Sequence, residues 1–265
     1  MRLFSKLCTA LLCVSLPLGC GGSSVSDLTQ DPGVRALDLK AADLTGTWNL
    51  TTTAINTTTC SSTTGRTAAI SIAVSGTTVT LTEAGQSNVV LTIKGSRVQG
   101  TSSKTTGSVR AESTWDFGAI GGRIDGTVNI RNVNAANGQL VCTEDQSISG
   151  YRSSLVPVAS LVGNWRVTLT TALVAGNCSN EIGATEVVDV KIELVNGALR
   201  LTLGSTPFDT SVAGNRLQGA VTLNGGALTF DIGAVDATTF EGTFAAGTTA
   251  VGLCSVTQAA IGQRI

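Results

Sequence analysis

The chain contains the same pattern of residues twice, and this repeat restricts the possible folds more than any other feature. The segment Leu44–Asn49 (LTGTWN) recurs as Leu161–Arg166 (LVGNWR), 117 residues later. A cysteine follows each tryptophan, after 12 residues in the first copy and 13 in the second. Each copy closes on another cysteine with Gln, Gly and Arg at offsets of 4, 8 and 10 residues. This agreement predicts two homologous domains, at residues 43–152 and 160–265.

Apolar and polar residues alternate along most of both domains, as in residues 70–74 and 188–194. A period of two is the pattern of a β-strand with one buried face and one wet face. Turn sequences such as Ser75-Gly76 and Asn196-Gly197 separate the alternating runs. We count about eight short strands per domain in sequential order, which predicts an up-and-down barrel. The expected fold is therefore all-β, with two tandem antiparallel eight-stranded barrels, and a β-sandwich is the alternative.

The first twenty residues have the pattern of an export signal. Arg2 and Lys6 precede the apolar run Leu7–Leu18, which is too short to span a bilayer. The run ends in Leu16–Cys20 (LPLGC), which resembles the lipobox of bacterial lipoproteins. The resemblance implies that residues 1–19 are a signal peptide, and an ordinary signal peptide without lipidation is the alternative.

The same resemblance implies that Cys20 is lipidated and becomes the mature N-terminus. Residue 21 is Gly rather than Asp, which in Gram-negative lipoproteins implies sorting to the outer membrane. Residues 20–42 are rich in Gly and Ser and then mixed polar, so we expect a flexible tether there. The expected location is the outer membrane or cell surface, on either side of the outer membrane, with the membrane as a partner through the lipid anchor.

Four cysteines remain after the three of the N-terminal segment, and an even number in an exported chain implies disulfides. They are Cys60, Cys142, Cys178 and Cys254. Each repeat contains two of them, which favours the pairs Cys60–Cys142 and Cys178–Cys254. One disulfide per domain is therefore expected.

The segment that opens each domain resembles the Gly-x-Trp motif of lipocalin-like barrels. In that family, an arginine of the last strand packs on this tryptophan at the closed end of the barrel. The resemblance implies that six residues form a structural motif at the barrel floors: Gly46, Trp48, Arg152, Gly163, Trp165 and Arg264. In a closed barrel the first and last strands pair, which would place each disulfide near the open end.

Composition excludes several kinds of chemistry. The chain has no histidine, which removes histidine-based acid–base catalysis, the Ser-His-Asp triad and histidine metal ligands. Its formal net charge is −1 without a basic run, which argues against nucleic-acid binding. The sequence has no phosphate-binding glycine loop, CxxC motif or serine nucleophile elbow. We therefore expect a protein that is not an enzyme and uses no cofactor or metal.

Two functions are compatible with these observations. In the first, the barrels bind a small hydrophobic ligand against an apolar interior that includes Phe230, Phe240 and Phe244. In the second, the barrels are filled, and the protein is a structural or adhesive surface lipoprotein that interacts with other envelope components. The threonine-rich run Thr51–Thr59 would then face a partner at the open end of the first domain. The sequence identifies neither the ligand nor a protein partner.

Overall fold

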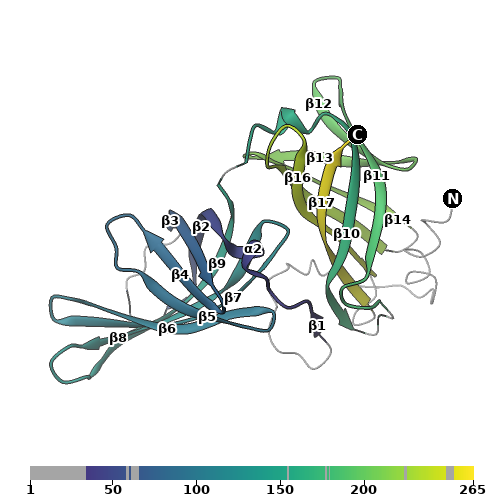
Figure 1. The fold of residues 1–265 in the computed structure, drawn as a ribbon. Coiled ribbons are helices and arrows are strands. Elements are labelled where there is room, and N and C mark those ends of the chain that lie inside the picture. Colours follow the sequence, from purple (N-terminus) through teal and green to yellow (C-terminus); the bar gives the residue numbers. More distant parts are fainter. Residues whose placement is uncertain are drawn as a thin grey trace. The chain divides into compact units, whose positions relative to one another are not determined.

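The two repeats form two antiparallel β-structures in the computed structural model (Figure 1). The structure describes residues 34–57, 60, 66–153, 155–176, 178, 180–223, 226–248 and 254–265. The expected signal peptide, Cys20 and the first part of the expected tether lie outside these residues. Contacts divide the described chain into two units, one of residues 38–153 and the other of residues 34–37 and 155–265.

Barrel 1, the unit of residues 38–153, is a closed ring of eight antiparallel strands in sequence order. Its strands are β2 (Gly46–Thr57), β3 (Arg66–Ser75), β4 (Thr78–Glu83), β5 (Val89–Lys94), β6 (Arg97–Thr106), β7 (Val109–Ile120), β8 (Arg123–Asn134) and β9 (Leu140–Arg152). The first and last strands close the ring, with Trp48 opposite Arg152 and Thr57 opposite Glu144. The eight-stranded barrel expected for this domain is confirmed.

Barrel 2, the unit of residues 34–37 and 155–265, is a sheet of nine strands rather than the expected eight. They are β1 (Val34–Ala36), β10 (Gly163–Gly176), β11 (Thr185–Val195), β12 (Ala198–Leu203), β13 (Thr206–Ala213), β14 (Arg216–Leu223), β15 (Gly226–Ala234), β16 (Thr239–Thr248) and β17 (Cys254–Arg264). Strands β10 and β17 also pair, with Trp165 opposite Arg264. The first and last of the eight strands of this repeat therefore pair with each other, and β1 is an additional strand.

The ninth strand comes from residues that the sequence pattern placed in the tether. Strand β11 reaches along β10 only as far as Thr170, which pairs with Thr185. Residues 34–36 pair with residues 173–175 of β10, beyond that point. A strand edge with unpaired amide and carbonyl groups favours such an addition. The Arg35 guanidinium also donates hydrogen bonds to the carbonyls of Cys178 (3.0 Å) and Asn180 (3.2 Å).

One disulfide is present in each barrel, as expected. Cys60 is bonded to Cys142 in barrel 1, and Cys178 is bonded to Cys254 in barrel 2. In each barrel the disulfide lies at the end opposite the tryptophan–arginine pair. Cys254 faces Gly176 at the far end of β10, and Cys142 lies near the start of β9, which ends at Arg152. Within the described part of the chain, no helix is long and apolar enough to cross a membrane.

Candidate functional site

A short helical turn lies under each barrel and precedes its first strand. These turns are α2 (Ala41–Leu44) in barrel 1 and the 3₁₀ helix η1 (Val158–Leu161) in barrel 2. The indole N–H of Trp48 donates to the carbonyl of Leu44, and that of Trp165 donates to the carbonyl of Leu161, both at 2.7 Å. The tryptophan of each repeat thus anchors the turn that closes its barrel.

The arginine of the last strand completes each floor. In barrel 1, Arg152 donates to the carbonyls of Ala42 and Asp43, both at 3.0 Å, and also to that of Thr45. In barrel 2, Arg264 donates to the carbonyls of Ser160 (2.5 Å) and Val162 (3.0 Å). These bonds satisfy carbonyl groups that the end of a short helix leaves without partners.

The glycine of each Gly-x-Trp sequence makes room for this arginine. Gly46 and Gly163 have φ angles of +138° and +150°. A Cβ atom on Gly46 would lie 2.8 Å from the Arg152 guanidinium, and one on Gly163 would lie 3.0 Å from that of Arg264. At each floor the expected glycine, tryptophan and arginine therefore lie together. The tryptophan and arginine bond to the helical turn, and the glycine leaves space for the arginine side chain.

The interior of barrel 2 is occupied by aromatic side chains. The rings of Phe208 and Phe230 are 5.2 Å apart edge to face, and those of Phe230 and Phe244 are 5.7 Å apart and stacked. Below them, Phe240 packs edge to face on Trp165 at 5.0 Å. These residues come from four strands and are at most 3% exposed. These rings are therefore packed on one another in the interior of the barrel.

The inner wall of barrel 1 changes from apolar near the floor to polar near the open end. Trp115 belongs to this wall, and its indole N–H donates to the Ser102 hydroxyl at 3.0 Å. Glu144 is only 8% exposed and accepts a hydrogen bond from Gln146 at 2.8 Å. The partner-facing run expected at this end, Thr51–Thr59, is partly strand β2, and residues 58 and 59 lie outside the described residues.

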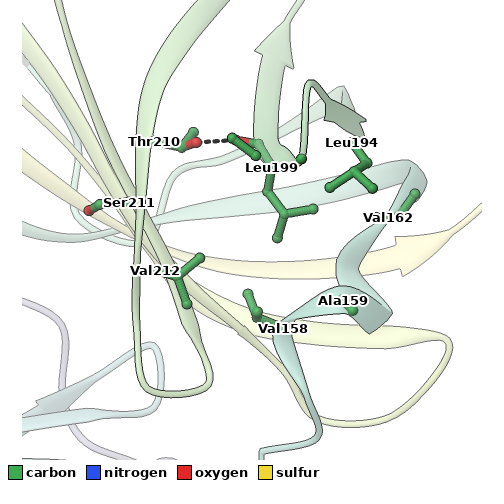
Figure 2. Close-up of a pocket in the computed structure, with 10 residues that line it drawn as sticks. Val158, Ala159, Val162, Leu194, Leu199, Thr210, Ser211 and Val212 are labelled. Carbon is green, nitrogen blue, oxygen red and sulfur yellow. Dashed lines mark hydrogen bonds between the residues drawn. The ribbon is translucent and has the colours of Figure 1, made fainter.

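A groove of about 440 Å³ lies at the closed end of barrel 2 (Figure 2). It is lined by η1 and the residue after it, by the β11–β12 hairpin and by the end of β13. The lining residues are Val158, Ala159, Val162, Leu194, Gly197, Ala198, Leu199, Thr210, Ser211 and Val212. None of these side chains is ionisable, so the groove is suited to hold an apolar group rather than to perform acid–base chemistry.

Large apolar side chains are exposed in this groove. Leu194 is 63% exposed, Val212 is 53% exposed and Val162 is 39% exposed. Leu194 continues the inward-facing row of Val190 and Ile192, but it stands at the end of its strand, beyond the packed core. The alternating pattern predicts that Leu194 is a core residue, and alternation carries no signal for the groove.

A second repeated motif, also missed by the sequence analysis, places an ion pair on each barrel. The sequences Arg97–Gly100 (RVQG) and Asp116–Ala119 (DFGA) recur as RLQG at 216–219 and DIGA at 231–234. In barrel 2, Nε of Arg216 is 2.5 Å from the Asp231 carboxylate. The Asp231 carboxylate also accepts a hydrogen bond from the Gln218 side chain at 3.2 Å. Each pair of segments is identical at three of four positions, and this agreement was the available sequence signal.

The two ion pairs differ in their exposure to solvent. The side chains of Arg216 and Asp231 are 3% and 11% exposed, whereas Asp116, the partner of Arg97 in barrel 1, is 42% exposed. Leu155 of the inter-repeat segment approaches the pair in barrel 2, because a Cβ atom on Gly233 would contact both Leu155 and Arg216. The ion pair therefore lies near the segment that leads into η1.

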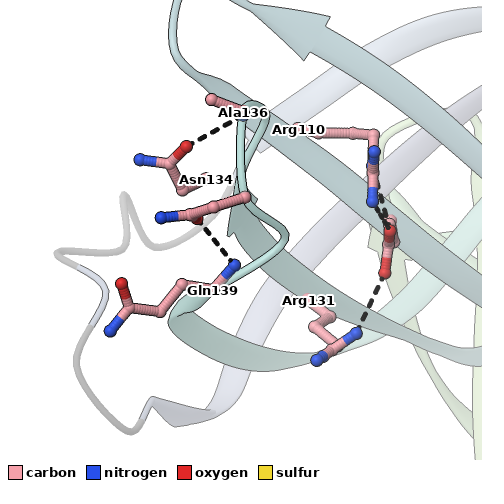
Figure 3. A network of polar contacts seen from close by, with 7 residues as sticks. Arg110, Arg131, Asn134, Ala136 and Gln139 are labelled. Carbon is pink, nitrogen blue, oxygen red and sulfur yellow. Dashed lines mark hydrogen bonds and ion pairs between the residues drawn. The ribbon is translucent and has the colours of Figure 1, made fainter.

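Ionisable side chains with shifted pKa values lie on surface strands and turns. The pKa of Glu112 is lowered by a hydrogen bond from Arg110 and by the positive charges of Arg110 and Arg131 (Figure 3). The pKa of Asp236 is lowered by hydrogen bonds from Thr238 and Thr239. Among the described residues, no group of three or more Cys, Asp or Glu side chains is arranged to hold a metal ion.

No protein-family model and no curated protein matches the chain. Among solved structures, the chain is similar to a crystal structure from Nostoc punctiforme, a protein with unknown function from the DUF3598 family. The two chains are 12% identical, the match covers 85% of this chain and 97% of that chain, and the TM-score is 0.36. A similarity at this level supports no inference about function.

Proposed function

We propose that this protein is a non-enzymatic, lipid-anchored protein of the cell envelope that binds a partner through the apolar groove of barrel 2. The observation that carries the proposal is the exposure of Leu194 and Val212 in a groove of about 440 Å³. Exposed apolar side chains gathered in a concave surface are typical of binding sites. Burial of apolar surface stabilises a complex by roughly 25 cal/mol per Å² before the costs of association.

A ligand held inside the barrels is less well supported. Phe208, Phe230 and Phe244 occupy the interior of barrel 2. In barrel 1, the upper inner wall includes the buried Glu144 and its half-buried hydrogen-bond partner Gln146, which do not suit a hydrophobic molecule. The groove requires no rearrangement of either interior, and we therefore favour the surface-interaction function.

The groove is tested with a fluorescent apolar dye, 8-anilinonaphthalene-1-sulfonate, titrated into the purified full chain. We expect saturable binding that weakens at least tenfold in the Val212→Asp variant, since the new charge would be desolvated by the dye. Val187→Asp is the matched control, because Val187 is equally exposed at 53% on the outer face of β11 in the same barrel. Equal dye affinity in the wild type and both variants would contradict the proposal.

The lipid anchor and envelope location are part of the same proposal and have separate support. The LPLGC sequence ending at Cys20 resembles a lipobox, and the two disulfides favour an oxidising compartment outside the cytoplasm. The Cys20→Ala variant tests the anchor. We expect it to leave the membrane fraction and to lose incorporation of radiolabelled palmitate. Membrane retention and unchanged labelling would argue against lipidation.

A further inference from the structure

The two barrels allow a residue-by-residue comparison of their closed ends. The last inward-facing pair before the corresponding hairpins is Val74–Val79 in barrel 1 and Leu194–Leu199 in barrel 2. On the next hairpin, Ile93 pairs with Val98 in barrel 1, as Val212 pairs with Leu217 in barrel 2. These correspondences identify the position in barrel 1 that matches the groove.

The matching position in barrel 1 is covered. Val74 and Ile93 are only half-buried, and both pack against the barrel core. Leu39, from the segment that leads into α2, packs against the same cluster. Its backbone N–H donates to the carbonyl of Gly95 at 3.0 Å, in the turn between β5 and β6. An extended segment with one leucine and one backbone hydrogen bond thus packs against this corner of barrel 1.

In barrel 2 the corresponding segment follows a different path. Val156 stands 117 residues after Leu39, but its N–H donates to the carbonyl of Ala234 at 3.0 Å, at the end of β15. The carbonyl of Leu155 accepts a hydrogen bond from the Asn215 side chain, also at 3.0 Å. The segment therefore lies between the end of β15 and Asn215 of the β13–β14 turn, where Val156 packs against the barrel core. Leu194 and Val212 stay exposed beside η1.

The turn that receives Leu39 in barrel 1 is reproduced in barrel 2. Gly95 and Gly214 occupy the same place in their hairpins, and both have a φ angle of +59°. The backbone of the β13–β14 turn thus has the geometry that accepts a segment in barrel 1, next to exposed apolar side chains. Barrel 2 therefore has counterparts of both the turn and the apolar side chains of the barrel 1 contact.

We propose that the groove of barrel 2 receives an extended peptide segment of a partner protein, with a leucine side chain between Leu194 and Val212 and a backbone N–H donated to the Gly214 carbonyl. This inference rests on the proposed function, and it names the chemical class of the partner. The template is the contact of residues 38–40 with barrel 1, because the two sites share topology, turn conformation and apolar lining. A free hydrophobic molecule would use the apolar surface but not the hydrogen bond.

The test uses a fluorescein-labelled peptide with the sequence of residues 36–41, Ala-Leu-Asp-Leu-Lys-Ala, and the purified full chain. Fluorescence anisotropy should show saturable binding to the wild type and to Val187→Asp, and at least tenfold weaker binding to Val212→Asp. A peptide with Asp in place of its second leucine should also bind at least tenfold more weakly. A peptide methylated on the N–H of that leucine should lose about fivefold or more, because a hydrogen bond contributes about 1 kcal/mol.

The outcomes separate this inference from the proposed function. If the dye binds in the groove and the peptide does not, the groove is a binding site and the peptide inference is wrong. Peptide binding that is unchanged in Val212→Asp would place the peptide elsewhere, and equal affinity of the N-methylated peptide would refute the backbone hydrogen bond. If neither probe binds, both the inference and the proposed function fail. The peptide variants require no change to the protein, so this test does not depend on the folding of a mutant.

Discussion

The guanidinium carbon of Arg152 lies 4.7 Å from the centre of the Trp48 indole ring, which is a stacked cation–π contact. Arg264 and Trp165 have the same separation, 4.7 Å, in barrel 2. In both barrels the two residues are also directly opposite each other where the first and last strands pair. The arginine and tryptophan therefore lie where the first and last strands pair, and the same two side chains hold the helical turn at that end of the barrel.

Replacement of Arg152 by Met should destabilise barrel 1 by about 1–3 kcal/mol, because it removes a cation–π contact and hydrogen bonds to helix carbonyls. Urea unfolding measures this effect. Arg131→Met is the matched control in the same barrel, since Arg131 makes an exposed ion pair with Glu112 at 3.3 Å. The control should change stability by less than about 0.5 kcal/mol. Equal effects of the two variants would show that Arg152 has no special role at the floor.

Replacement of Asp231 by Ala should destabilise barrel 2 by about 3–5 kcal/mol, because it leaves the charge of the buried Arg216 without its carboxylate. The double variant Arg216→Met and Asp231→Leu should recover most of this loss, since no buried charge then remains. Asp116→Ala in barrel 1 should cost less, because Asp116 is 42% exposed. Thermal unfolding of the three variants measures the difference. A double variant as unstable as Asp231→Ala would mean that packing, not charge burial, dominates.

Replacement of Gly262 by Ala should destabilise barrel 2 by about 1–3 kcal/mol or more through overpacking. A Cβ atom at this position would lie 2.1 Å from the Phe240 ring, which is fully buried against Trp165. Gly247→Ala is the matched control, because the nearest atom to a Cβ there is 3.8 Å away. Denaturant unfolding compares the two. Similar stability of both variants would contradict the close packing of Phe240 over Gly262.

The pKa of Glu112 should lie below the ordinary glutamate value of about 4.3. The pKa is lowered mainly by the hydrogen bond from Arg110, at 2.7 and 3.0 Å, and further by the charges of Arg110 and Arg131. A lowered pKa in the folded state contributes stability above the unfolded pKa, and this contribution is lost as the pH falls through the folded pKa. Carboxyl-carbon NMR should show the low midpoint, and Arg110→Gln should raise it. An unchanged midpoint in Arg110→Gln would refute the assigned cause.

Several features of the fold were predictable because they depend on local periodicity and on the repeat. The period of two gave the strands of both barrels, and the repeated tryptophan and terminal arginine indicated which strands close each ring. The two disulfide pairs followed from the distribution of four cysteines over two domains. The lipid anchor at Cys20 remains a prediction, because that residue lies outside the described part of the chain.

The sequence by itself thus predicted two antiparallel barrels and their strand order, since alternation and turn signals lie within a single repeat, and the resemblance to lipocalin-like barrels implied the floor contacts. The tertiary structure alone decided where the connecting segments lie. It placed residues 34–36 on the free edge of β10. It also placed the N–H of Leu39 on the β5–β6 turn of one barrel and the N–H of Val156 on the end of β15 of the other. Leu194 and Val74 have the same position in the alternating pattern, and they differ in burial because burial depends on what covers a side chain, which alternation does not encode.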